Sequence, residues 1–198
     1  MHKLKGHYLD TKHPVIIENL MGIKRRKGSI QKGKKPILIN HLKAIINVIN
    51  KEKIEEIKKA RDKAIILVGF GGGFRRTELI SIDCEDLEFV AEGVKITIKK
   101  SKTDQFGEGM IKGLPYFANE TYCPVAHLKK WIKISNIKDG PIFRRFTKGC
   151  SLTSNRLTDQ SVVLLIKSYL ELAGIENKNY SGHSLRSGFA TVSAESGA

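Results

Sequence analysis

Hydrophobic side chains recur at helical spacing in several separate stretches of this sequence. The clearest stretch follows Asn40, which we predict to be a helix N-cap, and its apolar positions are Leu42, Ile45, Ile46 and Ile49. The same spacing predicts further helices over residues 54–70, from residue 74, over 124–134, over 158–173 and from 181 onward. The glycines at 71–73 and at 174 are expected to end two of these helices.

One stretch has a different period. Over residues 94–99, apolar and polar side chains alternate one by one, which is typical of a half-buried β-strand. A turn rich in polar residues and glycine covers 101–109, and residues 110–116 are predicted to form the return strand. We therefore predict an α+β fold that is mainly helical, with a small antiparallel β-sheet between helices.

The first 35 residues differ from the rest, because they hold few periodic apolar positions and end in a basic run. Seven of the twelve residues from 24 to 35 are cationic, namely Lys24, Arg25, Arg26, Lys27, Lys32, Lys34 and Lys35. We predict a basic N-terminal arm or linker over 1–35, able to follow a phosphate backbone, and a folded domain over 36–198. A solvated tail without a partner is the alternative.

The charge of the whole chain points in the same direction. The sequence has 35 lysine and arginine residues against 20 aspartate and glutamate residues, which gives a formal net charge of +15. Such an excess favours a polyanionic partner, with a basic but unengaged surface as the alternative. A membrane is not expected as the partner, since the longest apolar run, 64–70, is too short to span a bilayer and no apolar signal region is evident.

Several familiar kinds of site are not predicted. Cys84, Cys123 and Cys150 are widely spaced and form no metal-binding pattern with the histidines, so we expect reduced thiols, no metal and no cofactor. The glycines at 71–73 fit neither a dinucleotide-binding loop nor a P-loop. The segment 182–186 is similar to a serine-hydrolase elbow, but Arg186 stands where that turn requires glycine.

Three cationic elements remain. Arg75 follows the glycine run, Lys102 lies in the turn of the predicted hairpin, and His183 with Arg186 begins the last helix on one face. In this order they resemble the catalytic domain of the tyrosine recombinases, the phage integrase family, with its Gly-x-Arg-x-x-Glu-Leu segment, hairpin lysine and His-x-x-Arg box. The resemblance covers residues 36–198, and residues 15–35 resemble the end of the DNA-clamping helical domain that precedes it.

The resemblance implies a role for each of these residues. Arg75 and Arg186 would stabilise the pentacoordinate phosphorane that forms during transesterification of DNA. Lys102 would be the general acid that protonates the leaving 5′-oxygen, and His183 would be a general base or a proton shuttle. Glu78 would hold Arg75 or His183 in place. No metal is implied, because the cations replace it.

The resemblance also implies a partner and a location. The substrate would be double-stranded DNA, contacted by the basic arm together with Arg76 and Lys100. The reaction would be site-specific recombination or integration of a mobile element, in the cytoplasm and associated with the nucleoid. Family members work as tetramers on DNA, so a homo-oligomer is expected of a full-length protein.

The sequence departs from the family at the nucleophile. In the family this group is a tyrosine well C-terminal to the His-x-x-Arg box, and no tyrosine follows Arg186 here. Tyr180 precedes the last helix, and we predict that its ring packs there. We therefore expect either a piece of a recombinase without its nucleophile or a degenerate integrase remnant that binds DNA without cutting it. An unrelated RNA-binding protein is disfavoured, since no aromatic RNP pattern or GXXG loop is present.

Overall fold

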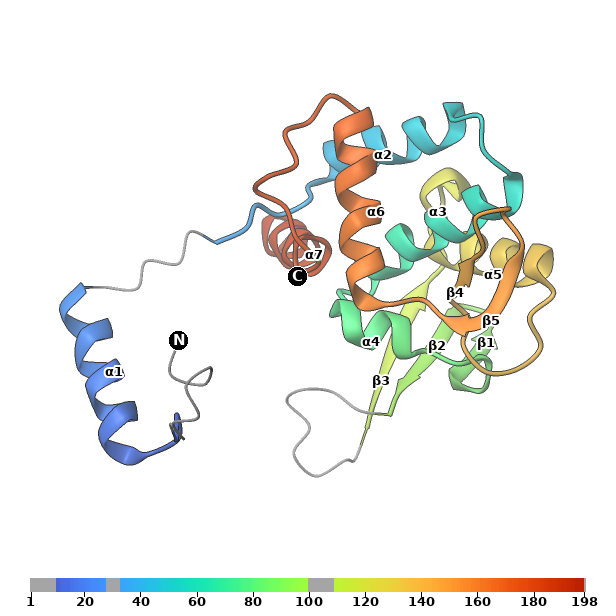
Figure 1. Ribbon diagram of the computed structural model, residues 1–198. Coiled ribbons are helices and arrows are strands. Elements are labelled where there is room, and N and C mark those ends of the chain that lie inside the picture. Colours follow the sequence, from blue (N-terminus) through green and yellow to red (C-terminus); the bar gives the residue numbers. More distant parts are fainter. Residues whose placement is uncertain (1–9, 28–32, 100–108, 198) are drawn as a thin grey trace. The chain divides into compact units, whose positions relative to one another are not determined.

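The computed structural model describes residues 10–27, 33–99 and 109–197 (Figure 1). Chain packing divides the protein after Gly33 into two compact units, 1–33 and 34–198. The first unit contains one described helix, α1 (Pro14–Lys27). Apolar residues of α1 are exposed, including Val15, Leu20 and Met21. No separate helix was predicted here from the sequence, beyond the resemblance of residues 15–35 to the end of a helical domain.

The second unit contains six further α-helices and two small sheets among its described residues. The helices are α2 (Ile39–Lys51), α3 (Glu56–Gly71), α4 (Arg76–Ser81), α5 (Pro124–Ser135), α6 (Asp159–Leu172) and α7 (Ser184–Glu195). Two 3-10 turns are η2 (Cys84–Asp86) and η3 (Glu120–Tyr122). The strands are β1 (Leu87–Val90), β2 (Gly93–Ile98), β3 (Met110–Pro115), β4 (Arg144–Phe146) and β5 (Leu152–Arg156). The predicted fold class, α+β and mainly helical with a small antiparallel sheet, is confirmed.

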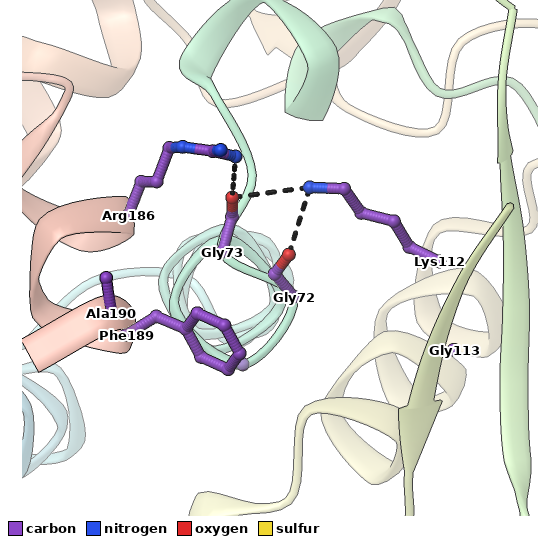
Figure 2. Close-up of a pocket in the computed structure, with 8 residues that line it drawn as sticks. Gly72, Gly73, Lys112, Gly113, Arg186, Phe189 and Ala190 are labelled. Carbon is purple, nitrogen blue, oxygen red and sulfur yellow. Dashed lines mark hydrogen bonds between the residues drawn. The ribbon is translucent and has the colours of Figure 1, made fainter. Parts of the chain in front are cut away.

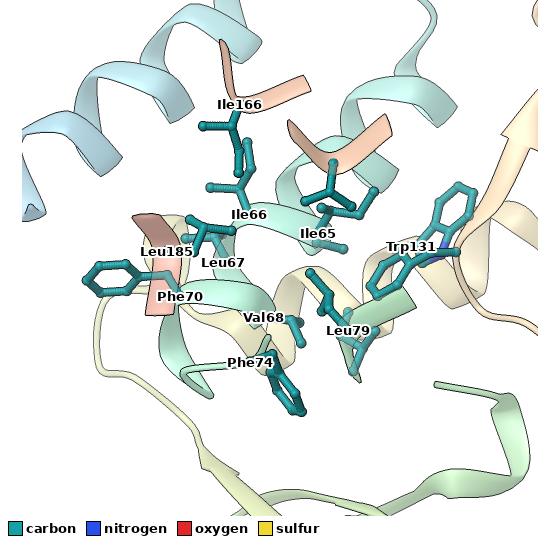
Figure 3. Close-up of a cluster of buried hydrophobic side chains, with 14 of the residues drawn as sticks. Ile65, Ile66, Leu67, Val68, Phe70, Phe74, Leu79, Trp131, Ile166 and Leu185 are labelled. Atoms are coloured by element: carbon teal, nitrogen blue, oxygen red, sulfur yellow. The ribbon is translucent and has the colours of Figure 1, made fainter. Parts of the chain in front are cut away.

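The centre of this unit is α3. Its residues from Ala64 to Phe70 are buried on all sides, because α2, α5, α6 and α7 pack around it. Figure 3 shows Trp131 of α5, Ile166 of α6 and Leu185 of α7 converging on this helix. A helix buried all round has no polar face, so its continuous apolar run is the expected sequence pattern.

The start of α2 differs from the prediction. Its predicted apolar face is buried, but the helix begins one residue before Asn40, at Ile39, and the N-cap is Leu38. His41 supplies the capping contact, because its Nδ1 accepts the Leu38 N–H at 3.2 Å. The Asn40 side chain instead accepts the His41 N–H at 2.9 Å. The prediction of an Asn40 cap was therefore wrong, since an imidazole satisfies the first free donor.

The larger sheet contains the predicted hairpin. Its strand order is β1-β2-β3 with antiparallel pairing, and Ile96 of β2 is opposite Lys112 of β3. β1 and the pair β4–β5 were not predicted. The side chains of Glu88 and Phe89 in β1 are both exposed, and no residue of β4 or β5 is fully buried, so none of these strands carries a clear two-residue burial pattern.

The segment that enters α2 also crosses the start of α7. Lys34 Nζ donates to the carbonyl of Lys178, 144 residues away, at 3.0 Å. The N–H of Ile37 donates to the carbonyl of Ser184 at 2.9 Å. A Cβ atom at Gly188 would lie 1.9 Å from the Ile37 carbonyl oxygen, so only glycine permits this approach. We call residues 34–37 the strap.

None of the described helices is both long enough and apolar enough to cross a membrane.

Candidate functional site

The candidate site is built around a glycine corner between α3 and α4. Gly73 has φ +53°, a left-handed conformation that favours glycine, and a Cβ there would lie 2.6 Å from the ring of Phe189. The corner turns the chain sharply and leaves the carbonyls of Gly72 and Gly73 as acceptors for side chains from other elements. The glycine run therefore ends α3 and shapes the site.

Arg75 is the N-cap residue of α4, and Glu78 binds both its guanidinium group and its backbone N–H. The Arg75 Nη1 donates to Glu78 Oε1 at 2.5 Å, while the Arg75 backbone N–H donates to Glu78 Oε2 at 3.0 Å. The Glu78 side chain is only 2% exposed. A buried carboxylate is stable only when it is paired and hydrogen-bonded, so Glu78 and the arginine hold each other in place.

Arg186 reaches the same corner from the first turn of α7. Its Nη1 donates to the carbonyl of Gly73 at 2.7 Å (Figure 2). His183 is the N-cap residue of α7, directly before this turn, and its side chain is exposed. The structure thus brings Arg75, Glu78 and Arg186 together at the corner, with His183 at the exposed end of α7.

Lys112 is a fourth member that the sequence analysis missed. It lies on β3, and its Nζ donates to the carbonyls of Gly72 and Gly73 at 3.1 and 3.3 Å. The same Nζ lies 3.5 Å from Glu78 Oε2. Burial lowers the pKa of Lys112 from its usual value, with Arg186 and Arg75 adding to this effect and Glu78 opposing it. A signal was available, because Lys112 shares a strand face with the buried Leu114.

A cavity of about 410 Å³ opens beside these groups. Figure 2 shows Lys112 and Arg186 reaching the glycine corner from opposite sides, with Phe189 of α7 below. The lining residues are Gly71, Gly72, Gly73, Lys112, Gly113, Arg186, Phe189 and Ala190. Among the described residues, the corner gathers Arg75, Lys112 and Arg186 against a single carboxylate, Glu78, so it can accept an anion.

The other predicted site residues are distributed as follows. Lys32, Lys100 and Lys102 lie outside the described residues, and α1 ends at Lys27. The remaining basic residues of the arm, Lys24, Arg25, Arg26, Lys34 and Lys35, are exposed. Arg76 pairs with Asp159 of α6, with 3.1 Å between its Nε and the carboxylate. Within the described ranges, no group of three or more His, Cys, Asp or Glu side chains is placed to hold a metal ion.

Two of the tyrosines near the C-terminal part of the sequence are buried. Tyr180 is 4% exposed, its ring packs edge-on against His41, and burial raises the pKa of its hydroxyl. Tyr169 donates its hydroxyl to Asp62 at 2.7 Å. A buried phenol with a raised pKa is a poor nucleophile, because the reactive phenolate is disfavoured.

Two arginines and a lysine gathered on one corner form an arrangement that is suited to bind an anion. The profile of the Phage integrase family matches residues 37–198. The chain therefore belongs to the phage integrase family, and its fold is that of a tyrosine recombinase catalytic domain.

Relatives of known sequence and structure agree with this assignment. The chain is 42% identical over 190 residues to an integrase/recombinase XerD homolog of Selenomonas ruminantium, a match that covers 96% of this chain and 55% of that protein. It is also 30% identical over 156 residues to the tyrosine recombinase XerD of Staphylococcus haemolyticus, over 78% of this chain and 48% of that protein. The chain thus spans about half the length of these relatives.

A solved structure shows the same fold. It is the XerH site-specific recombinase bound to its palindromic difH substrate, in a post-cleavage complex, with a TM-score of 0.64 at 20% identity. The likeness covers 83% of this chain and 43% of the XerH chain.

Proposed function

We propose that this chain is the catalytic domain of a site-specific DNA recombinase that cuts and rejoins strands through a 3′-phosphotyrosine. The observation that carries the proposal is the glycine corner, where Arg75 and Arg186 come together from elements far apart in the sequence. The family relationship supplies the reaction, and the DNA-bound XerH recombinase supplies the substrate class.

The two arginines account for the main chemical demand of this reaction. A phosphate under attack gains negative charge on its equatorial oxygens, and two planar guanidinium groups can share that charge through paired hydrogen bonds. Preorganised donors of this kind contribute about 3–4 kcal/mol each in comparable oxyanion sites. Glu78 supports this role by holding Arg75, so the guanidinium needs little reorganisation when the phosphate arrives.

Proton transfer requires two further residues. We assign Lys102 as the general acid for the leaving 5′-oxygen and His183 as the general base or proton shuttle. The exposed position of His183 at the start of α7 supports this role, since an exposed imidazole can meet a DNA strand without rearrangement of the core.

The basic arm is proposed to contact the DNA backbone. Lys24, Arg25 and Arg26 are exposed on α1, and Lys34 and Lys35 are exposed next to the domain. Lysine and arginine residues in such positions release counterions from DNA and make binding depend on salt. Lys27, Lys32, Lys100 and Arg76 are proposed to extend this contact, and a tetramer on DNA is the proposed working assembly.

The nucleophile is proposed to come from outside these 198 residues. No tyrosine follows Arg186 in the sequence, and Tyr180 is buried. The second candidate function is a DNA-binding integrase remnant that does not cut. The exposed cations Lys24, Arg25 and Arg26 support it, because they would bind DNA whether or not a nucleophile is present.

A nicked suicide duplex separates the two functions. We expect the 198-residue chain to bind the duplex, and its affinity should fall by a factor of about 10³ or more when the salt concentration rises from 50 to 200 mM. Mass spectrometry should detect no covalent adduct. A protein extended beyond residue 198 by the sequence of its own gene should form the adduct if it is a recombinase. An adduct on the 198-residue chain would refute the assignment of the nucleophile, and salt-independent binding would refute the role of the arm.

A further inference from the structure

We propose that Lys112 is a positioning residue that fixes the two arginines of the candidate site relative to each other. The inference rests on the proposed function, because it concerns how the phosphate-binding groups of that same site are held. Lys112 comes from β3, an element separate from the helices that carry Arg75 and Arg186.

The contacts of Lys112 place it between the arginines. It shares the Gly73 carbonyl with Arg186, at 3.3 Å for the lysine and 2.7 Å for the arginine. It shares the Glu78 carboxylate with Arg75, through Oε2 for the lysine and Oε1 for the arginine guanidinium. The Lys112 ammonium group therefore connects the Gly73 carbonyl, which orients Arg186, with the Glu78 carboxylate, which orients Arg75.

The hydrogen-bonding capacity of Lys112 is already used within the protein. A lysine ammonium has three donors, and the Nζ of Lys112 has three acceptors: the Gly72 carbonyl, the Gly73 carbonyl and Glu78. Its side chain is 15% exposed, and its Nζ lies 4.4 Å from the centre of the Phe74 ring. A group so engaged is suited to hold its neighbours, and less suited to give its proton to a leaving oxygen or to bind phosphate alone.

The protonated state of Lys112 is required for this role. A neutral amine has two hydrogens and would leave one of the three acceptors without a donor, and it would also leave Glu78 with less positive charge nearby. Charges that face Lys112 are Glu78, Arg75 and Arg186. Loss of the proton should therefore loosen both arginines together.

The direct test uses NMR to measure how fast the guanidinium hydrogens of Arg75 and Arg186 exchange with water in the unliganded 198-residue chain. In the Lys112→Met variant we expect their exchange with water to accelerate at least about threefold, because the Gly73 carbonyl and the Glu78 carboxylate lose the contact that holds them in position for the arginines. Lys112→Arg should restore most of the protection, since it returns a cation. The matched control is Lys95→Met, which removes an exposed lysine from the neighbouring strand.

The indole N–H of Trp131 distinguishes a local effect from a global one. It donates to the Ile142 carbonyl at 2.7 Å in the core, so its exchange reports overall unfolding. Equal acceleration of Trp131 and of both arginines would mean that Lys112 only supports the fold, which would overturn the proposal. Unchanged arginine exchange in Lys112→Met would overturn it as well.

Orthovanadate, an analogue of the pentacoordinate transition state of phosphoryl transfer, links this test to the proposed function. We expect Lys112→Met to weaken vanadate binding about tenfold or more, while Lys112→Arg and Lys95→Met stay within about threefold of wild type. If vanadate does not bind wild-type protein, the proposed phosphate site fails, but the exchange data still decide the role of Lys112.

In an extended, active protein, Lys112→Met should lower kcat and leave KM nearly unchanged. A lower kcat that a 5′-bridging sulfur substrate restores would make Lys112 a general acid and overturn the positioning role.

A pH titration of wild-type protein keeps the proposal testable if Lys112→Met does not fold. Burial lowers the pKa of Lys112, so its ammonium loses its proton below the pH at which an ordinary lysine does. We expect the side-chain signals of Arg75 and Arg186 to shift together in that pH range, as the shared contacts are lost. Arginine signals that remain constant through the titration of the Lys112 ammonium would overturn the proposal.

Discussion

Two buried charge clusters in this domain differ in their balance of charge. At Asp62, the neighbouring Arg61 donates to one carboxylate oxygen through Nε and Nη2, at 2.9 and 2.7 Å, and the Tyr169 hydroxyl donates to the other. One described cation thus meets one anion. At Glu78, the described cations Arg75 and Lys112 share the carboxylate, and Arg186 joins them through the Gly73 carbonyl.

The difference teaches how to tell a structural cluster from a site. The Asp62 cluster is satisfied by the protein itself, and its guanidinium also bonds the Arg144 carbonyl and lies over the Phe146 ring. The Glu78 cluster has an excess of positive charge among the described residues and lies beside a cavity. A buried carboxylate with one cation joins elements of the fold, whereas a surplus of cations leaves capacity for an incoming anion.

The largest expected effect is on stability, at the balanced cluster. Asp62→Ala leaves the Arg61 charge buried without its counter-ion, and we expect a loss of about 3–5 kcal/mol in the free energy of unfolding. Urea denaturation measures this loss, with Asp62→Asn as the isosteric control. If the variant still folds, its vanadate affinity should be unchanged, and a selective loss of that affinity would show that the Asp62 cluster belongs to the site.

The next effect is on catalysis, at the cation-rich cluster. In an extended protein that carries a nucleophilic tyrosine, Arg75→Ala or Arg186→Ala should slow strand cleavage by a factor of at least about 100, corresponding to roughly 3–4 kcal/mol of transition-state stabilisation. Single-turnover cleavage of a labelled duplex measures the rate, and a binding assay should show that DNA affinity persists. Near-normal cleavage by either variant would refute the assignment.

The smallest effect is expected at an exposed ion pair next to the site. Arg76 and Asp159 are each about one-third exposed, so Asp159→Ala should change stability by less than about 1 kcal/mol. Thermal unfolding measures this change, and Asp62→Ala under the same conditions provides the contrast. A stability loss as large as that of Asp62→Ala would contradict the view that burial decides how much each of these ion pairs contributes to stability.

The sequence predicted those parts of the fold in which burial is periodic. The apolar faces of α2 and α6 and the alternation in β2 were visible because each element buries one side. β1, β4 and β5 were missed because their side chains are largely half-buried or exposed. The cap of α2 was assigned to Asn40 because asparagine is a frequent cap, and the tertiary position of His41 decided otherwise.

The candidate site was predicted only as far as its local motifs extend. Arg75, Glu78 and Arg186 stand in short segments with recognisable spacing, and the structure brings them to the corner. Lys112 has no such segment, and its position depends on the register that places it opposite Ile96. A lysine on the inward face of a strand is a signal that can be read once the face of the strand is known.

The strap has a consequence for the time at which this domain becomes functional. It joins residues that are 144 positions apart, as the Lys34–Lys178 contact shows, and it seats the start of α7, where Arg186 lies. Contacts between such distant segments close large loops and form late and slowly in folding. Because Leu185 of α7 belongs to the α3 core, the last side of that core and the position of Arg186 depend on the same late contacts. The proposed affinity for phosphate would therefore arrive in the last folding phase, together with the final packing of α3.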